Sequence, residues 1–342
     1  VVEDLNAVAF VQRYLLPMVI RHADRLTEAT RQQLTESLRI GCDEIRRMDV
    51  AVTYTNVAAM HALSCCLGGE WLNDEALAQY GYEKLERLVT LTAENGTVYE
   101  FNSPIYVEVT IDSLHRLASL TRYVPARIQA QTMLTRLALT TMLRLEPQTG
   151  YLTGPHSRAT YDTTICAGQP ERDMFTDWVK SGVLPEWFLR TTPTQERPLQ
   201  IKETAYAPWQ IATTTFVSHS FTLGTATREI SRQTNVLTAH YPIANADRPA
   251  VMGSRYLIND TWFGDPERAP DRSEKPRLTD AGKAFVVQDG PRAIAVFAPR
   301  TLEHPASLAP ASQDKFRTAK LVILWAPRHH VESVFINMEP IQ

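Results

Sequence analysis

The spacing of the apolar residues changes once along this chain, and no other feature of the sequence restricts the fold as much. Up to about residue 146 apolar residues recur at helical spacing, as at Leu34, Leu38 and Ile45. From about residue 200 they alternate with polar residues, as in Ile211–Val217, and the later runs are rich in Val, Ile, Thr and aromatic residues. We therefore predict an α-helical part followed by a meander of antiparallel strands.

The helical part is predicted to contain roughly six helices between residues 5 and 146. Short connections make sequence neighbours antiparallel, and an array of such hairpins tends to curl into a solenoid or toroid. The third helix is predicted to end at Gly68-Gly69, a common stop signal. The fifth is predicted to begin at Ser103-Pro104, where a capping hydroxyl precedes a proline.

The stretch between the two parts, residues 147–200, is rich in proline and glycine. Long ordered loops of this kind commonly carry function. Short helices are predicted within it around Asp177–Val179 and Trp187–Leu189. In the second part, Asp289-Gly290 predicts a tight hairpin, and the charged run Asp265–Arg277 predicts an exposed loop.

These patterns predict an α+β multidomain protein. Residues 1–195 are expected to form the helical-hairpin array, and residues 196–342 an antiparallel β-sandwich. The 342 residues suffice for two domains, and the apolar content of 44% is that of a protein with a real core.

Composition and missing motifs disfavour several classes of function. The net charge is −3 with acids and bases interspersed, which argues against nucleic-acid binding, and no run approaches the roughly 20 apolar residues of a membrane span. C-x-x-C, H-E-x-x-H, Walker A and G-x-G-x-x-G motifs are absent, so we expect no metal and no cofactor. The sequence starts at Val1 without methionine, so a leader has been removed or the sequence is trimmed. The compartment stays open, with secretion slightly favoured over the cytoplasm, and so does the oligomeric state.

Three segments carry polar residues where packing alone does not require them. They are Tyr54–Asn56, Glu100–Tyr106 and Gly154–Tyr161. Alternate helices of a hairpin array begin at the same end, so Asn56, Asn102 and the His156 loop are expected to line one cleft. Helix N-termini at that end would favour an anionic ligand.

Simpler alternatives exist for these residues. Asn56 and Asn102 are suited to capping helices, and the Gly-Pro before His156 is suited to building a turn. A lone histidine is more often structural than catalytic. His156, however, is followed by Arg158 and Tyr161, which add a fixed cation and a phenol to the titrating imidazole.

The stretch from Tyr54 to Tyr161 resembles the helical part of heparinase II/III-like and alginate-lyase-like proteins. The resemblance is carried by T-N-x-x-x-M-x-A-L from Thr55, E-F-N-S-P-x-Y from Glu100 and G-P-H-S-R from Gly154. The segment from Leu223 to Arg228 fits the same pattern in the β part. This family implies an (α/α) toroid followed by a β-sandwich, but six long helices are too few for a complete toroid, so a reduced one is implied.

The resemblance also implies a reaction, β-elimination next to a uronate in an anionic oligosaccharide or small molecule. Asn56, Asn102 and Arg158 would neutralise the uronate carboxylate. His156 and Tyr161 would transfer the protons, with the Arg158 cation lowering the pKa of the Tyr161 phenol.

Three further residues are candidates for binding the substrate: Tyr106, Lys202 and Tyr206. The two tyrosines are also alternative proton carriers. His219 and His240 lie on predicted strands and are interpreted as structural.

Other functions stay open beside the lyase. A glycoside hydrolase needs two carboxylates around one bond, and Glu100, Asp112 and Glu203 are the available acids. A small-molecule lyase, cyclase or isomerase of secondary metabolism would use the same His and Tyr groups. A non-catalytic glycan-binding protein would rely on exposed aromatic side chains.

Overall fold

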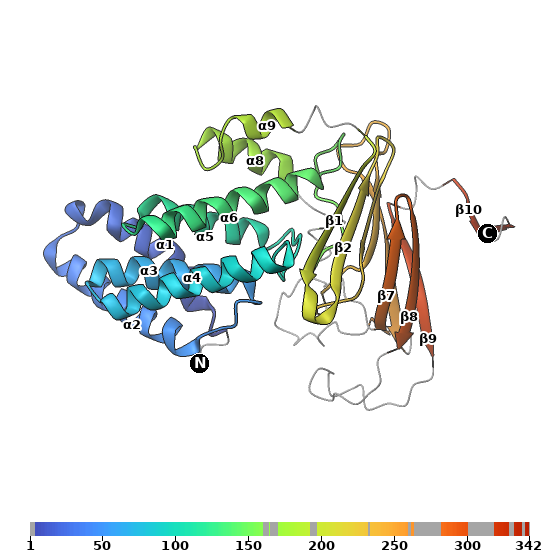
Figure 1. Ribbon diagram of the computed structural model, residues 1–342. Coiled ribbons are helices and arrows are strands. Elements are labelled where there is room, and N and C mark those ends of the chain that lie inside the picture. The colour runs from blue at the N-terminus through green and yellow to red at the C-terminus, as the bar shows by residue number, and fades with distance from the viewer. Residues whose placement is uncertain are drawn as a thin grey trace. The chain divides into compact units, whose positions relative to one another are not determined.

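The computed structural model describes residues 4–159, 164, 170–191, 197–231, 233–258, 261–262, 282–299, 318–327, 332–336 and 339–341. Within them helices precede antiparallel strands, which confirms the predicted α+β class (Figure 1). The chain divides into two compact units. The first comprises Val1–Phe101 and Tyr106–Thr140, and the second comprises Asn102–Ile105 and Thr141–Gln342. The division therefore falls earlier in the chain than the expected residue 195.

The first unit is helical and is centred on one buried helix. Its elements are α1 (Ala7–His22), the 3-10 turn η1 (Ala23–Arg25), α2 (Glu28–Met48), α3 (Thr55–Leu72), α4 (Glu75–Asn95), α5 (Val107–Leu120) and most of α6 (Val124–Leu143). Every residue of α3 from Thr55 to Gly69 is buried, and α3 contacts α1, α2, α4 and α5. A helix that is apolar on all sides belongs in the interior, so α3 forms the core of this unit.

The two glycines in α3 do not end the helix, so that prediction is wrong. A Cβ built on Gly69 would lie 2.3 Å from the backbone nitrogen of Ala78 in α4, and one built on Gly68 would lie 2.5 Å from the Sγ of Cys42. The glycines therefore serve the close packing of α3 against its neighbours. The helix ends at Asn73, which adopts the left-handed conformation with φ of +55°.

The predicted start of α5 at Ser103-Pro104 is also wrong, because α5 begins at Val107 with Tyr106 as its N-cap residue. Asn102 has a φ of +46°, which turns the chain, and the Ser103 hydroxyl donates to the backbone oxygen of Arg158 over 2.8 Å. Asn102 and Ser103 therefore belong to the second unit and are not part of α5.

In the part of the second unit that the structure describes, the short helices α8 (Glu171–Lys180) and α9 (Trp187–Thr191) precede the strands. They confirm the two short helices predicted in the irregular stretch. The strands are β1 (Leu199–Tyr206), β2 (Ile211–Val217), β3 (Thr222–Ala226), β4 (Leu237–Tyr241), β5 (Ala250–Ile258), β6 (Thr261–Trp262), β7 (Gly282–Asp289), β8 (Arg292–Pro299), β9 (Ala319–Ala326), β10 (Val334–Ile336) and β11 (Glu339–Ile341), with the 3-10 turn η2 (Ala207–Trp209) after β1.

The main sheet is the predicted antiparallel meander. Strands β1 to β6 pair in sequence order, and β9 pairs with β5. The strands β7 and β8 form a separate hairpin, and so do β10 and β11. Asp289 pairs with Arg292 across a two-residue turn, which confirms the hairpin signal. The expected exposed loop Asp265–Arg277 lies outside the described residues.

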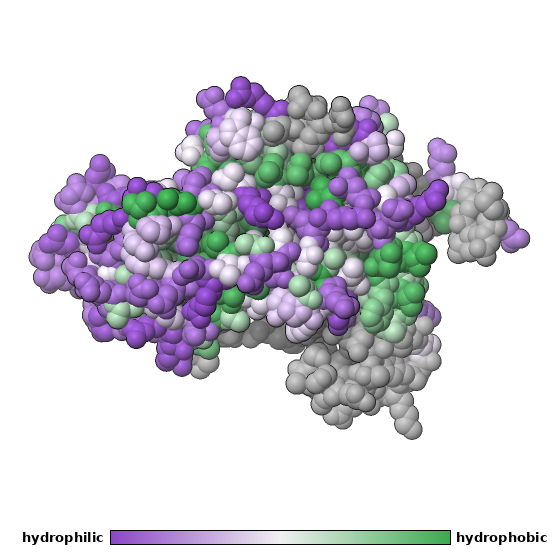
Figure 2. Space-filling model, in the orientation of Figure 1, coloured by the Kyte–Doolittle hydropathy of each residue, from purple (hydrophilic) through white to green (hydrophobic). Residues whose placement is uncertain are grey.

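The β7–β8 hairpin lies against β3 with one face and leaves the other face uncovered by described residues. The side-chain amide of Gln288 accepts from the Thr225 hydroxyl over 2.7 Å and donates to the backbone oxygen of Leu223 over 3.0 Å. The outer face is apolar, and Figure 2 shows it as green atoms at this hairpin. Its exposed side chains are Phe285, Val287, Ile294 and Val296.

No described helix is long and apolar enough to cross a membrane. Three of the four cysteines, Cys42, Cys65 and Cys66, are buried free thiols. Burial raises the pKa of Cys42 to about 12, so its thiol is unreactive at neutral pH. Cys166 lies outside the described residues.

Candidate functional site

The segment from Thr153 to His156 lies directly on the main sheet. Thr215, Gly224 and Thr238 are register partners across β2, β3 and β4, so their side chains share one face. A Cβ built on Gly154 would lie 1.8 Å from the Oγ1 of Thr238, and one built on Gly224 would lie 1.9 Å from the backbone oxygen of Gly154. Glycines at both positions therefore allow the segment to touch the sheet backbone.

Asn102 anchors this segment and fixes the imidazole of His156. Its side-chain nitrogen donates to the backbone oxygens of Thr153 and Pro155, both over 2.7 Å. Its own backbone oxygen lies 2.9 Å from Nδ1 of His156. Because a carbonyl oxygen can only accept, Nδ1 carries the proton and Nε2 carries the lone pair.

A cluster of buried polar atoms around His156 has no hydrogen-bond partner among the described residues. These atoms are Nε2 of His156, Oδ1 of Asn102, Oδ1 of Asn235, Oγ1 of Thr238 and Nδ1 of His240. Asn235 is the bridge partner of His156, and the rings of His156 and His240 lie edge to face with centroids 6.3 Å apart. Each such atom costs about 1–3 kcal/mol, so their concentration marks this cluster as the candidate site.

Both histidines of the cluster are neutral at pH 7. Burial lowers the pKa of His156 to about 4, and the positive charge of Arg144 adds to this effect while the carbonyl of Asn102 opposes it. Burial lowers the pKa of His240 to about 3, with a further contribution from the charge that His156 would carry. The interior therefore holds two uncharged imidazoles side by side.

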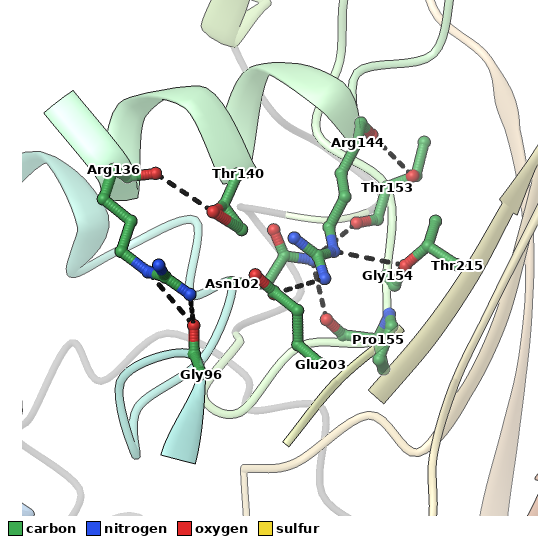
Figure 3. A network of polar contacts seen from close by, with 10 residues as sticks. All are labelled: Gly96, Asn102, Arg136, Thr140, Arg144, Thr153, Gly154, Pro155, Glu203 and Thr215. Atoms are coloured by element: carbon green, nitrogen blue, oxygen red, sulfur yellow. Dashed lines mark hydrogen bonds and ion pairs between the residues drawn. The ribbon is translucent and has the colours of Figure 1, made fainter. Parts of the chain in front are cut away.

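Arg144, which no sequence pattern marked, joins the segment to β1 and β2 (Figure 3). Its guanidinium donates to Oε2 of Glu203 over 2.6 Å and to Oγ1 of Thr215 over 3.2 Å. Its backbone oxygen accepts from the amide and the hydroxyl of Thr153, over 3.0 and 2.6 Å. Arg144 is 2% exposed and Glu203 13%, so the guanidinium is buried and the carboxylate is half-buried.

Arg158 lies on the same segment as His156 but is half-buried. Its Nε donates to the side-chain oxygen of Gln233 over 3.0 Å, and its backbone oxygen accepts from Ser103. Tyr161, the predicted phenol of the site, lies outside the described residues.

Asn56 and Tyr106 belong to the first unit, whereas Asn102 and His156 belong to the second. The backbone nitrogen of Asn56 donates to Oε2 of Glu100 over 3.0 Å, and the Glu100 nitrogen donates to the Thr55 hydroxyl over 3.2 Å. This reciprocal pair resembles a capping box built from two segments. The positive end of α3, which was expected to attract an anionic ligand, thus already holds the carboxylate of Glu100.

Tyr106 and the two candidates on β1 have simpler surroundings. The backbone oxygen of Tyr106 accepts from the amide of Thr110 over 3.0 Å in the first turn of α5. Lys202 is exposed and points to the face of β1 opposite Glu203. The Tyr206 ring packs edge to face on Trp209, with centroids 5.4 Å apart.

The three acids that a glycoside hydrolase would need are each held in place by donors. Glu100 accepts from the start of α3, Glu203 pairs with Arg144, and Asp112 pairs with Arg13 and Arg116 over 3.2 and 2.7 Å. Among the described residues, no three His, Cys, Asp or Glu side chains gather into a metal-ligating group.

The cluster around His156 falls partly within a known sequence family. Residues 3–167 match the model of a domain of unknown function, DUF8769. The match is just under half of the chain and includes Asn102, Arg144 and His156, but ends before Glu203 and His240. No curated protein and no solved structure matches the chain.

Sequence reasoning brought Asn102 and His156 together correctly but missed Arg144 and Asn235 and took His240 as structural. Arg144 follows α6, where a basic residue is usual, so nothing local distinguished it. Asn235 and His240 lie about 80 residues beyond His156 in the sequence. Strand pairing in the second unit brings them to His156, and no spacing rule in the sequence predicts that contact. The one available signal was a histidine inside a predicted strand, at His240.

Proposed function

We propose that the chain is a polysaccharide lyase-like enzyme that cleaves uronate-containing glycans by β-elimination. His156 is the group that accepts the C5 proton. The observation that supports this role is the hydrogen bond from its Nδ1 to the Asn102 carbonyl, which leaves Nε2 as a buried lone pair with no partner among the described residues. A neutral imidazole held in one tautomer is the form that a general base requires.

The geometry changes the role of Asn102 from the one expected. Its side-chain nitrogen is already used by two backbone oxygens, so it has no donor left for a developing enediolate. Its unpartnered Oδ1 is an acceptor, which suits a substrate hydroxyl. Arg158 stays the proposed cation for the uronate carboxylate and Tyr161 the proposed acid for the leaving oxygen. A carboxylate bound near His156 would raise the pKa of that imidazole from about 4 and make it a stronger base.

The finer architecture is part of the same proposal. The helices of the first unit would form a reduced (α/α) toroid, which their antiparallel connections favour. The β7–β8 hairpin would be one layer of a β-sandwich, which is supported by the contacts of Gln288 with Thr225 and Leu223 on β3.

A second candidate is a small-molecule lyase or isomerase, favoured by the complete burial of His156. A polymer needs an open cleft, whereas a small carboxylated substrate needs only a brief opening of the Gly154–Arg158 segment. The proton transfer by His156 would be the same in both cases.

The test is an ultraviolet absorbance assay of the purified protein against a panel of uronate-containing polysaccharides and uronate disaccharides. Elimination creates an unsaturated uronate, so absorbance rises with time. His156→Gln is expected to abolish the rise, and His61→Gln, which alters a buried histidine of the first unit, is expected to keep it.

The outcomes separate the candidates. Activity on polymers supports the lyase, and activity on disaccharides alone supports the small-molecule enzyme. New reducing ends without absorbance would overturn both in favour of a hydrolase. Turnover that survives His156→Gln would remove His156 from the reaction.

A further inference from the structure

The ion pair between Arg144 and Glu203 lies where removing the two charges from water costs free energy that a purely structural contact would not require. Burying two charges costs several kcal/mol each, and a well-packed apolar pair is often as stable or more so. Arg144 is 2% exposed and its guanidinium meets the Glu203 carboxylate at 2.6 Å. A cation at this depth acts strongly on any titrating group nearby, because the interior screens charge weakly.

A continuous path of hydrogen bonds leads from this ion pair to the backbone of Gly154, two residues before His156. The Arg144 Nε donates to the hydroxyl of Thr215, and that hydroxyl donates in turn to the backbone oxygen of Gly154 over 3.1 Å. A threonine hydroxyl has one proton and can accept as well, so both bonds are satisfied at once. Gly154 is two residues before His156 on the segment that contacts the sheet.

Arg144 also holds the other end of the same segment. Its backbone oxygen accepts two bonds from Thr153, the residue next to Gly154. The side chain of Asn102 completes the frame by donating to the oxygens of Thr153 and Pro155 (Figure 3). One residue, Arg144, therefore fixes both the backbone and the charge around His156.

We propose that Arg144 and Glu203 are a positioning pair for His156, which hold the Gly154–His156 backbone against the sheet and so fix the imidazole with Nε2 as its acceptor. The catalytic consequence rests on the proposed function, but the positioning itself does not. Glu203 orients the guanidinium, and Arg144 supplies the positive charge that opposes protonation of the ring. The other titrating group facing His156 among the described residues is His240, which is itself neutral.

The experiment observes the imidazole directly in the full chain. Protein labelled with ¹⁵N-histidine is followed by NMR between pH 4 and 8, and the His156 signals are assigned by their loss in His156→Gln. The main variant combines Arg144→Met with Glu203→Leu, because replacing both members of a buried ion pair by apolar residues of similar volume is often neutral for stability. Thr215→Val keeps the charge and removes only the hydrogen-bond path.

The expected results distinguish positioning from structure. Wild-type His156 should show one tautomer, with the proton on Nδ1, at pH 7. The double variant should keep the wild-type midpoint of urea unfolding, yet its His156 ring should exchange between tautomers and titrate at a higher pH. Thr215→Val should disturb the tautomer without that rise in titration pH. A double variant that folds and shows wild-type His156 signals would overturn the proposal.

Failure of the proposed function is recognised separately. If no uronate substrate is turned over, the NMR results still decide whether the pair positions His156. If a substrate is turned over, the double variant should lower kcat by about 100-fold with little change in KM, as displaced catalytic groups do. Turnover at the wild-type rate would sink the positioning role while leaving the proposed function intact.

Discussion

Each of the two units buries a cation that pairs with an acid, but in different surroundings. In the first, Lys84 is 1% exposed and meets Asp49 at 2.6 Å, and in the second, Arg144 is 2% exposed and meets Glu203 at 2.6 Å. Each cation lies near a buried histidine. Burial lowers the pKa of His61 to about 4 with a contribution from Lys84, and that of His156 to about 4 with a contribution from Arg144.

The difference lies in what else holds each group. Asp49 is 53% exposed, and Lys84 also donates to the backbone oxygen of Val50, so this pair fastens the end of α2. Neither ring nitrogen of His61 has a partner among the described residues, whereas Nδ1 of His156 is tied to the Asn102 carbonyl. A buried cation beside a histidine is thus compatible with simple packing. The backbone anchor that selects one tautomer is what distinguishes the candidate site.

The largest expected effect comes from removing one acid from each pair. Glu203→Gln removes the carboxylate that the buried Arg144 guanidinium meets at 2.6 Å, so the free energy of unfolding should fall by about 3–5 kcal/mol. Asp49→Asn should cost about 1 kcal/mol, because its carboxylate is already half in water. Urea unfolding of both variants measures the contrast. Equal losses would mean that the two pairs do not differ in kind.

The next largest effect is an acid-dependent loss of stability that both histidines should contribute. The folded-state pKa values of His61 and His156, about 4, lie below the ordinary value of 6.5, so only the unfolded chain gains these protons as the pH falls from 6.5 to 4. Stability is therefore full above pH 6.5 and is lost towards pH 4, by about 3 kcal/mol for each such histidine.

Leucine substitutions reveal each histidine's share of this loss. His61→Leu should flatten the decline of stability with acid and be neutral or stabilising at pH 7, since it breaks no hydrogen bond among the described residues. His156→Leu should flatten the decline equally but cost about 1–3 kcal/mol at pH 7, because the Asn102 carbonyl loses its partner. Thermal unfolding at pH 7 and 5 is the measurement. A His61→Leu variant that is as destabilised at pH 7 as His156→Leu contradicts the comparison.

A glycine substitution should affect the second unit alone. Gly224→Ala places a methyl against the backbone of Gly154, so we expect a loss of about 1–3 kcal/mol and a displaced Thr153–His156 segment. Labelled-histidine NMR should show a changed His156 and an unchanged His61. Gly182→Ala is the matched control, because a Cβ there meets no atom within 4 Å even though its φ of +76° disfavours alanine. Movement of the His156 signal in this control as well would count against the contact.

The smallest effect is expected at Lys202, which the sequence had placed in the substrate site. Its exposed side chain lies on the face of β1 opposite Glu203, so Lys202→Ala should change the free energy of unfolding by less than about 0.5 kcal/mol. The His156 NMR signals should not move. A clear shift of these signals would return Lys202 to the site.

Local signals in the sequence predicted the secondary-structure elements well, but they predicted less well which contacts the individual residues make. Asp289-Gly290 specifies a tight turn by its own conformational preference, and the β7–β8 hairpin follows. Gly68-Gly69 is the same kind of local signal, but α3 continues through both residues. Glycines are needed at these positions because α4 and Cys42 approach too closely for any side chain. Ser103 reads as a helix cap, yet its hydroxyl bonds to Arg158, a partner 55 residues away. Tertiary contacts decided these two cases, and sequence spacing does not contain them.

The residues of the candidate site also divide into those marked by a local signal and those brought in by tertiary contacts. Asn102 and His156 were found because each stands in a polar segment that packing did not explain. Arg144, Asn235 and His240 belong to the site through strand register and long-range bonds, which a single sequence does not specify.

The assignment of Asn102–Ile105 to the second unit has a consequence for synthesis on the ribosome. The loop leaves the ribosome among the helices, but the carbonyl partners of Asn102, at Thr153 and Pro155, are made about 50 residues later. At roughly 5–20 residues per second, the loop waits on the order of several seconds before its destination exists. The helices can assemble during this delay, but the histidine tautomer cannot be set until the second unit forms. A chain truncated after Thr140 would keep the side-chain amide of Asn102 but would lack its two acceptors, the backbone oxygens of Thr153 and Pro155.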